Sequence, residues 1–184
     1  MQTAHELFLH GLSDMLDAER RLVEALGEQA EGATNPQLQK AFLAHQVQTE
    51  KQVQRIELVF EQLGEQPEET ECKGLKGLLE EVESFKEEDP SEDILDVFSI
   101  AAAMKVESYE MNGYESLIRL ATEMEHTKAV KLLTQNLKEE QAAWKKLDGL
   151  AKKIKPERTG HEEAEVEAED EGAEQPRRRG GRAA

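Results

Sequence analysis

The sequence has 184 residues and a formal net charge of −17 at pH 7, which suggests one domain with extra sequence at an end and argues against a nucleic-acid-binding bundle. No segment approaches the roughly 18 consecutive apolar residues of a membrane helix, and residues 1–12 lack the features of a signal peptide. The single cysteine, Cys72, excludes an internal disulfide, and we expect a cytoplasmic protein.

Two long helices are predicted in the first third of the chain, joined by a short connection. Thr3 begins a capping box, and the first helix should run over about residues 4–31. Asn35 followed by Pro36 is a typical helix start, and the second helix should end at Gly64. Apolar residues recur at helical spacing in both segments, among them Phe8, Leu12, Leu22, Phe42, Ile56 and Phe60.

Residues 64–91 are rich in glycine and proline and should form a long crossover that contains one short helix. A third helix is predicted to open at residues 89–92, and a fourth runs from a break near residues 125–127 to about Ile154. No segment shows a strand pattern. We therefore predict an all-α fold, a ferritin-like antiparallel four-helix bundle with a long crossover between its second and third helices.

The end of the chain has a different composition. Residues 156–184 hold an acidic, alanine-rich run and then an arginine-rich run, with few apolar residues to bury. We expect the bundle to occupy residues 1–155 and residues 156–184 to form a disordered tail. The arginines could contact nucleic acid, but the acidic run beside them opposes this, and we do not expect such a partner.

Carboxylates interrupt the apolar stripes of the predicted bundle. Glu19, Glu107 and Glu140 each occupy a stripe position in the first, third and fourth long helices. In the second long helix, Glu50 lies next to the stripe residue Thr49 and is expected to reach inward. All four glutamates lie roughly 20–24 Å from the start of their helix, so an antiparallel bundle would bring them to one layer.

A layer of buried carboxylates requires compensation. Isolated buried carboxylates are costly and like charges repel, so the groups must either take up protons or bind cations. Glu110 lies three residues after Glu107 on the same helix face and could hold a second ion. A single glutamate on a stripe also fits a side chain that extends to solvent. The predicted metal ligands are Glu19, Glu50, Glu107, Glu110 and Glu140.

Six segments of the chain carry a resemblance to a known family: residues 7–12, 17–19, 34–36, 59–64, 105–110 and 137–140. They resemble the YciE/YciF ferritin-like proteins. The resemblance covers about residues 5–152, and it rests on the ordered set of segments. It implies a bacterial family associated with stress responses, with a fold similar to rubrerythrin and bacterioferritin. It also implies two ions of iron or manganese that react with oxygen or peroxide.

Some metal-ligand positions of the ferritin-like pattern are matched directly in this sequence. The glutamate expected on the first helix of ferritin-like proteins is matched by Glu19. The Glu-x-x-Glu pair of rubrerythrin-like proteins is matched by Glu107 and Glu110.

The two Glu-x-x-His motifs of the family pattern are only half matched. Glu50 and Glu140 fit the glutamates, but Val53 and Ala143 stand where the histidines would be. A site made of carboxylates alone is less selective for iron. The alternative is a non-enzymatic structural stress protein, a dimer with a degenerate metal site. We expect a homodimer in either case.

Other polar residues on the predicted core faces have two interpretations. His45 is expected to be a hydrogen-bonded core residue rather than a ligand, because it lies about 7.5 Å along the helix from Glu50. Tyr114 is expected mainly to pack in the core, with a hydrogen bond to the site as its alternative role. Gln52, Gln54 and Asn136 are further candidate oxygen donors.

Overall fold

The computed structural model describes residues 1–156, which contain five helices and no strand. The predicted tail lies outside the described residues, apart from Pro156. The helices are α1 (Ala4–Gly32), α2 (Pro36–Leu63), α3 (Lys73–Lys86), α4 (Glu92–Glu123) and α5 (Thr127–Ala151).

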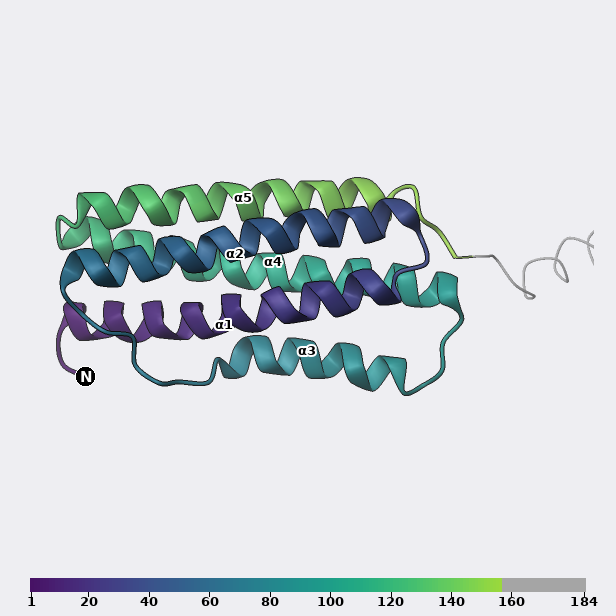
Figure 1. Cartoon of the computed structure of the whole chain (residues 1–184), viewed down its shortest axis with the longest axis horizontal. Coiled ribbons are helices and arrows are strands. Elements are labelled where there is room, and N and C mark those ends of the chain that lie inside the picture. Colours follow the sequence, from purple (N-terminus) through teal and green to yellow (C-terminus); the bar gives the residue numbers. More distant parts are fainter. Residues whose placement is uncertain (157–184) are drawn as a thin grey trace, which may run out of the picture.

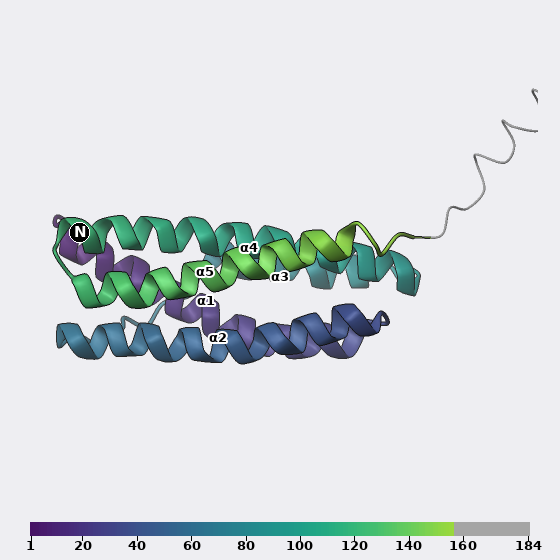
Figure 2. The same ribbon diagram turned by 90° about the horizontal axis from the view of Figure 1, so that it is seen from above.

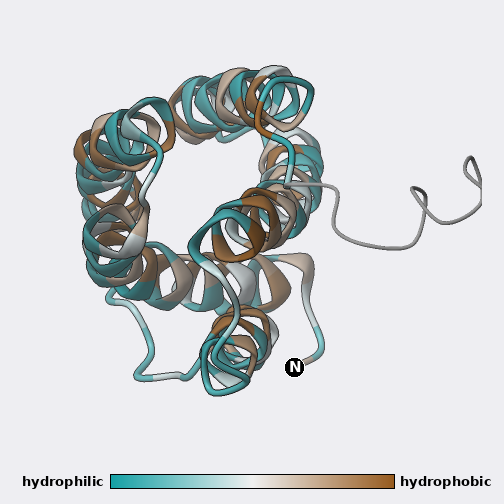
Figure 3. Cartoon of the chain, turned by 90° about the vertical axis from the view of Figure 1, so that its right-hand side faces the viewer, coloured by the Kyte–Doolittle hydropathy of each residue, from teal (hydrophilic) through white to brown (hydrophobic). Residues whose placement is uncertain are grey.

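The four long helices run side by side along the length of the molecule (Figures 1 and 2). α1 and α2 form one antiparallel hairpin, and α4 and α5 form the other, with α2 packed on α5 and α1 on α4. The short helix α3 lies on the crossover, against α4 and α1, and outside the ring formed by the long helices (Figure 3). The predicted all-α bundle and its long crossover with a short helix are confirmed.

Local capping signals explain the bounds of the helices. Thr3 Oγ1 accepts a hydrogen bond from the Glu6 amide at 3.1 Å, and the Glu6 carboxylate accepts one from the Thr3 amide. Asn35 Oδ1 accepts a hydrogen bond of 2.9 Å from the Gln37 amide at the start of α2. Gly64 ends α2 with a φ of 71°, a left-handed conformation that glycine adopts without steric cost.

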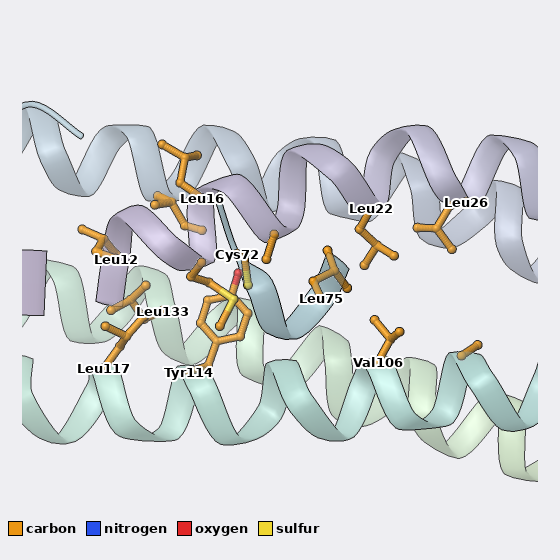
Figure 4. Close-up of a cluster of buried hydrophobic side chains, with 14 of the residues drawn as sticks. Leu12, Leu16, Leu22, Leu26, Cys72, Leu75, Val106, Tyr114, Leu117 and Leu133 are labelled. Atoms are coloured by element: carbon orange, nitrogen blue, oxygen red, sulfur yellow. The ribbon is translucent and has the colours of Figure 1, made fainter. Parts of the chain in front are cut away.

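Apolar side chains fill the interior on both sides of the bundle's middle (Figure 4). Leu12, Leu117 and Leu133 lie toward one end, and Leu22 and Val106 lie toward the other. These two apolar segments enclose the central layer, where the polar side chains described below are located. The crossover adds Cys72 and Leu75 to the same core, both with no exposed surface.

A buried aspartate fixes the α1–α2 connection to α4. Asp96 is 3% exposed and accepts hydrogen bonds from the Thr34 amide at 3.1 Å, the Thr34 hydroxyl at 2.8 Å and the Asn35 amide at 2.8 Å. Three donors from one connection stabilise the buried charge. The contact sets the position of the first hairpin against the second.

We expect Asp96→Ala to lower the free energy of unfolding by about 2–4 kcal/mol, because three buried donors lose their acceptor. Urea denaturation followed by circular dichroism measures this change. Glu115→Ala, at an exposed position of the same helix, is the control and should change stability by less than about 0.5 kcal/mol. Equal effects of the two substitutions would contradict this role of Asp96.

Candidate metal centre

Four glutamates lie in the middle of the bundle with almost no exposed surface. α1 contributes Glu19, α4 contributes Glu107 and Glu110, and α5 contributes Glu140. Glu107 is 2% exposed and the other three are fully buried. Each of them occupies a position on an otherwise apolar helix face, so helix packing alone carries the carboxyl groups into the interior.

α2 contributes a histidine to the same layer. His45, Glu107, Glu110 and Glu140 each offer one potential ligand atom, and these atoms lie within 4.8 Å of one another. His45 Nε2 lies 3.1 Å from Glu107 Oε1 and 3.4 Å from Glu140 Oε2. One nitrogen and several carboxylate oxygens at this spacing form a donor set suited to iron, manganese or zinc.

Many of the buried oxygens have no hydrogen-bond partner. Among the described residues, these include one carboxylate oxygen each of Glu19, Glu107 and Glu140, and both oxygens of Glu110. Neither ring nitrogen of His45 makes a hydrogen bond of good geometry, although Nε2 is close to two carboxylates. Unpartnered buried acceptors are costly, and a cation would satisfy several at once. The donor set therefore fits a metal ion.

Burial and mutual repulsion change the acidity of these groups. Burial raises the pKa of Glu107 to about 7. Burial, together with repulsion from neighbouring carboxylates, raises the pKa values of Glu110 and Glu140 well above their ordinary range. The pKa of Glu19 is also raised by burial and by repulsion from Glu140, against a lowering effect of a hydrogen bond from Tyr114. Without a cation, protons are the remaining source of compensation.

A chain of hydrogen bonds connects Glu19 to the protein surface. The Tyr114 hydroxyl donates to Glu19 Oε1, and Asn136 Nδ2 donates to the Tyr114 oxygen at 2.9 Å. Arg55 Nη1 donates to Asn136 Oδ1 at 2.7 Å, and the Arg55 guanidinium makes two hydrogen bonds to Glu139. Because arginine can only donate, the Asn136 carbonyl faces Arg55 and its amide faces Tyr114. This leaves the Tyr114 proton directed at Glu19.

Glu50 does not lie in the carboxylate layer, and the expectation that it reaches inward was wrong. Glu50 is exposed, whereas Thr49 and Gln52 are fully buried. Successive helix residues are rotated by about 100°, so the stripe that carries Thr49 turns its neighbour outward. The buried pair three residues apart on α2 is therefore Thr49 and Gln52, and Gln52 Nε2 donates a hydrogen bond to Glu140.

The predictions from sequence patterns assigned too small a role to His45 and Tyr114. α2 and α4 run in the same direction (Figure 1). Along this shared direction His45 comes before Gln52 on α2, and Glu107 comes before Glu110 on α4. The polar layer extends along the bundle far enough to include His45. Its position on the core stripe of α2 was the one available signal. Of the candidate oxygen donors, Gln52 and Asn136 are buried in this layer, and Gln54 is exposed.

The profile of the family described as Domain of unknown function (DUF892) matches residues 3–160. The chain belongs to this family. It is 38% identical over 152 residues to Protein YciF of Escherichia coli, and the aligned region covers 82% of this chain and 92% of YciF.

Two solved structures that are 38% identical to this chain show the same architecture. The crystal structure of YciF, an E. coli stress protein, has a TM-score of 0.79, covering 82% of this chain and 96% of YciF. YcfI from Rhodopseudomonas palustris has a TM-score of 0.78 at 38% identity, covering 80% of this chain and 94% of that one.

A more distant structure supports the fold alone. A two-domain protein from Anabaena variabilis, with DJ-1/ThiJ/PfpI-like and ferritin-like domains, is 16% identical with a TM-score of 0.57. It matches all of this chain and 42% of that protein. The ferritin-like fold predicted for this member of the DUF892 family is confirmed.

The raised carboxylate pKa values predict how metal-free protein responds to pH. Glu107 is protonated in the folded state up to about pH 7 but ionises near pH 4.5 when unfolded, so the unfolded state binds fewer protons between these values. The contribution of Glu107 to the free energy of unfolding should therefore be greatest below pH 4.5. It should fall as pH rises from 4.5 to about 7 and be lost above that. For Glu107 alone the loss is on the order of 3 kcal/mol.

Urea denaturation of metal-free protein between pH 5 and pH 8 tests this expectation, with Glu107→Gln as the comparison. Glutamine cannot ionise, so the variant should lose a smaller fraction of its stability across this range. A variant with the same pH dependence as the parent would contradict a raised Glu107 pKa.

Tyr114→Phe should lower the free energy of unfolding by about 1–3 kcal/mol, because Glu19 loses a buried donor and Asn136 loses an acceptor. Urea denaturation of the single variants Tyr114→Phe and Arg55→Met and of the double variant measures the coupling along the chain. The two effects should not add, since both substitutions interrupt one hydrogen-bonded chain. Strict additivity would show that Arg55 does not act through Asn136 and Tyr114.

Proposed function

We propose that this protein binds two ions of iron or manganese in its central layer and reacts with oxygen or peroxide there. The observation that carries the proposal is the cluster of His45 with three buried glutamates, to which the buried Glu19 is added from α1, with several oxygens that lack hydrogen-bond partners. Ions held by such a set would satisfy these oxygens and offset their mutual repulsion.

The proposed ligands are His45, Glu107, Glu110 and Glu140, with Glu19 completing the site from α1. Both oxygens of Glu110 lack partners, so this side chain is suited to contact two ions. The imidazole of His45 adds the nitrogen donor that an all-carboxylate site would lack; imidazole suits iron, and the carboxylates suit manganese. Glu50, being exposed, is not included.

Iron or manganese bound here would supply the electrons for reaction with oxygen or peroxide. The protein's own residues would orient the ligands and exclude water. Gln52 holds Glu140 through a hydrogen bond, and Tyr114 holds Glu19. Such partners fix the orientation of metal ligands and tune metal affinity.

A role in stress responses follows by analogy with YciF, which is described as a stress protein. A cytoplasmic location and a homodimer remain predictions. None of the helices within residues 1–156 is long and apolar enough to cross a membrane. Light scattering coupled to size-exclusion chromatography would measure the oligomeric state.

The second candidate function is a structural stress protein with a degenerate site. Thr49 and Gln52 favour it, because they occupy the inward positions of α2 where the ferritin-like pattern has Glu-x-x-His. The R. palustris relative YcfI is itself described as a protein with a proposed structural role. Metal binding separates the two candidates.

Metal-free protein titrated with ferrous iron under anaerobic conditions should bind about two equivalents. Iron at 100 times its dissociation constant should stabilise the fold by about 2.7 kcal/mol for each ion bound, which calorimetry detects as a higher melting temperature. Admission of air should then produce the absorbance of an oxidised di-iron centre. Absence of binding would leave the structural role as the function.

Two matched glutamate substitutions test the location of the ions. Glu107→Gln keeps the shape of a buried ligand and should weaken iron binding by more than about 10-fold. Glu50→Gln makes the same change at an exposed position of α2 and should leave binding unchanged. If both variants bind iron like the parent, the ions are held elsewhere.

A further inference from the structure

A cavity of about 260 Å³ lies directly beside the candidate metal centre. Its polar inner end is formed by His45 of α2 and Glu107 of α4, both nearly fully buried. Its outer part includes Lys146 of α5, which is exposed. The cavity therefore connects the surface with two members of the polar cluster.

The walls of this cavity are mostly apolar. Seven of its eleven lining residues have apolar side chains, including Leu26, Phe42, Ala143 and Leu147. An apolar cavity of roughly 150 Å³ is enough to bind benzene. The space here is larger than a metal ion, molecular oxygen or hydrogen peroxide needs, and neither a metal ion nor hydrogen peroxide would gain from contact with leucine and phenylalanine side chains. The walls indicate an organic ligand with an apolar body.

The inner end specifies a head group that both donates and accepts a hydrogen bond. Glu107 Oε2 is buried without a partner and requires a donor. Neither nitrogen of the His45 ring has a partner of good geometry, and a neutral imidazole has one N–H and one acceptor nitrogen. A single O–H group can donate to Glu107 and accept from His45.

Charges at the two ends of the cavity disfavour an ionised ligand. A carboxylate head would be repelled by Glu107 and the neighbouring buried glutamates. An ammonium head would have to pass Lys146, whose own ammonium forms no ion pair within the described part of the chain, and would meet the cations proposed for the site. A neutral head avoids both penalties.

We infer that this cavity binds a neutral organic molecule of roughly six to ten non-hydrogen atoms, with an apolar body and one O–H head group. Alcohols and alkyl hydroperoxides share this chemistry. In the metal-free protein the head lies at His45 and Glu107, and the body lies along the walls from Leu26, Phe42 and Leu147. The inference deepens the proposed function, since it names the class of molecule that reaches the metal centre.

Three ligands with one hexyl chain test the inference on the full chain in its metal-free form. Chemical shift changes of alanine methyl groups report the binding of 1-hexanol, hexyl hydroperoxide and hexanoate. The two neutral ligands should bind at least about 10-fold more tightly than hexanoate. Tighter binding of the hydroperoxide would identify hydroperoxides as the ligand source, and tighter binding of hexanol would identify alcohols. Preference for hexanoate, or absence of hexanol binding, would overturn the inference.

Filling the cavity provides a matched test of where hexanol binds. Ala143→Leu adds bulk at a lining position and should weaken hexanol binding at least about 10-fold, whereas Ala101→Leu makes the same change at an exposed position of α4 and should have no effect. Ala142→Leu, at the outer part of the cavity, replaces Ala143→Leu if that variant does not fold. Unchanged hexanol binding in the filled variant would place the ligand elsewhere and overturn the inference.

The outcomes for the cavity and for the metal centre are distinguishable. Hexanol binding is measured without metal, so its failure would not affect the result of the iron titration. Conversely, failure of the iron titration would remove the proposed redox function and leave the hexanol result valid. Hexanol binding to iron-free protein would then define the cavity as a ligand site of a structural protein.

Discussion

The main constraint on this structure is the burial of several carboxyl groups in one layer of an apolar bundle. Glu19, Glu107, Glu110 and Glu140 are brought together by four-helix packing, and their repulsion opposes the same packing. The protein must therefore compensate their charge with protons or cations before the helices can pack closely. The apolar segments on either side of the layer, together with the Asp96 contacts, stabilise the bundle against this local cost.

The fold could be predicted because its signals are local. The capping box at Thr3, the Asn35 cap and the left-handed Gly64 each act within a few residues, and the structure shows all three. The buried glutamates could be predicted for a similar reason, since a charge on an apolar stripe is conspicuous. Glu50 could not be placed correctly, because a shift of one residue turns a side chain by about 100° and an uncharged Thr49 does not mark the inward face.

The part played by His45 required information that no single helix contains. It depends on the relative levels of α2 and α4, which belong to different hairpins, and these levels are set by the long crossover and by packing. Tyr114 is a similar case, because its hydrogen bond to Glu19 spans two helices. Sequence patterns specify which face of a helix is buried, whereas contacts between helices from separate hairpins need the three-dimensional arrangement.

The composition of the layer also constrains the ions it can hold. When ionised, its four glutamates carry the same total charge, with opposite sign, as two divalent cations. α2 adds His45, Thr49 and Gln52, which contribute polar atoms but no further negative charge when the imidazole is neutral. Two divalent ions would therefore leave the layer neutral, and two trivalent ions would leave an uncompensated positive charge in an apolar interior. If the proposed ions bind, charge balance would favour their divalent state at rest, which is the state able to reduce oxygen or peroxide, and a neutral ligand in the adjoining cavity would not disturb it.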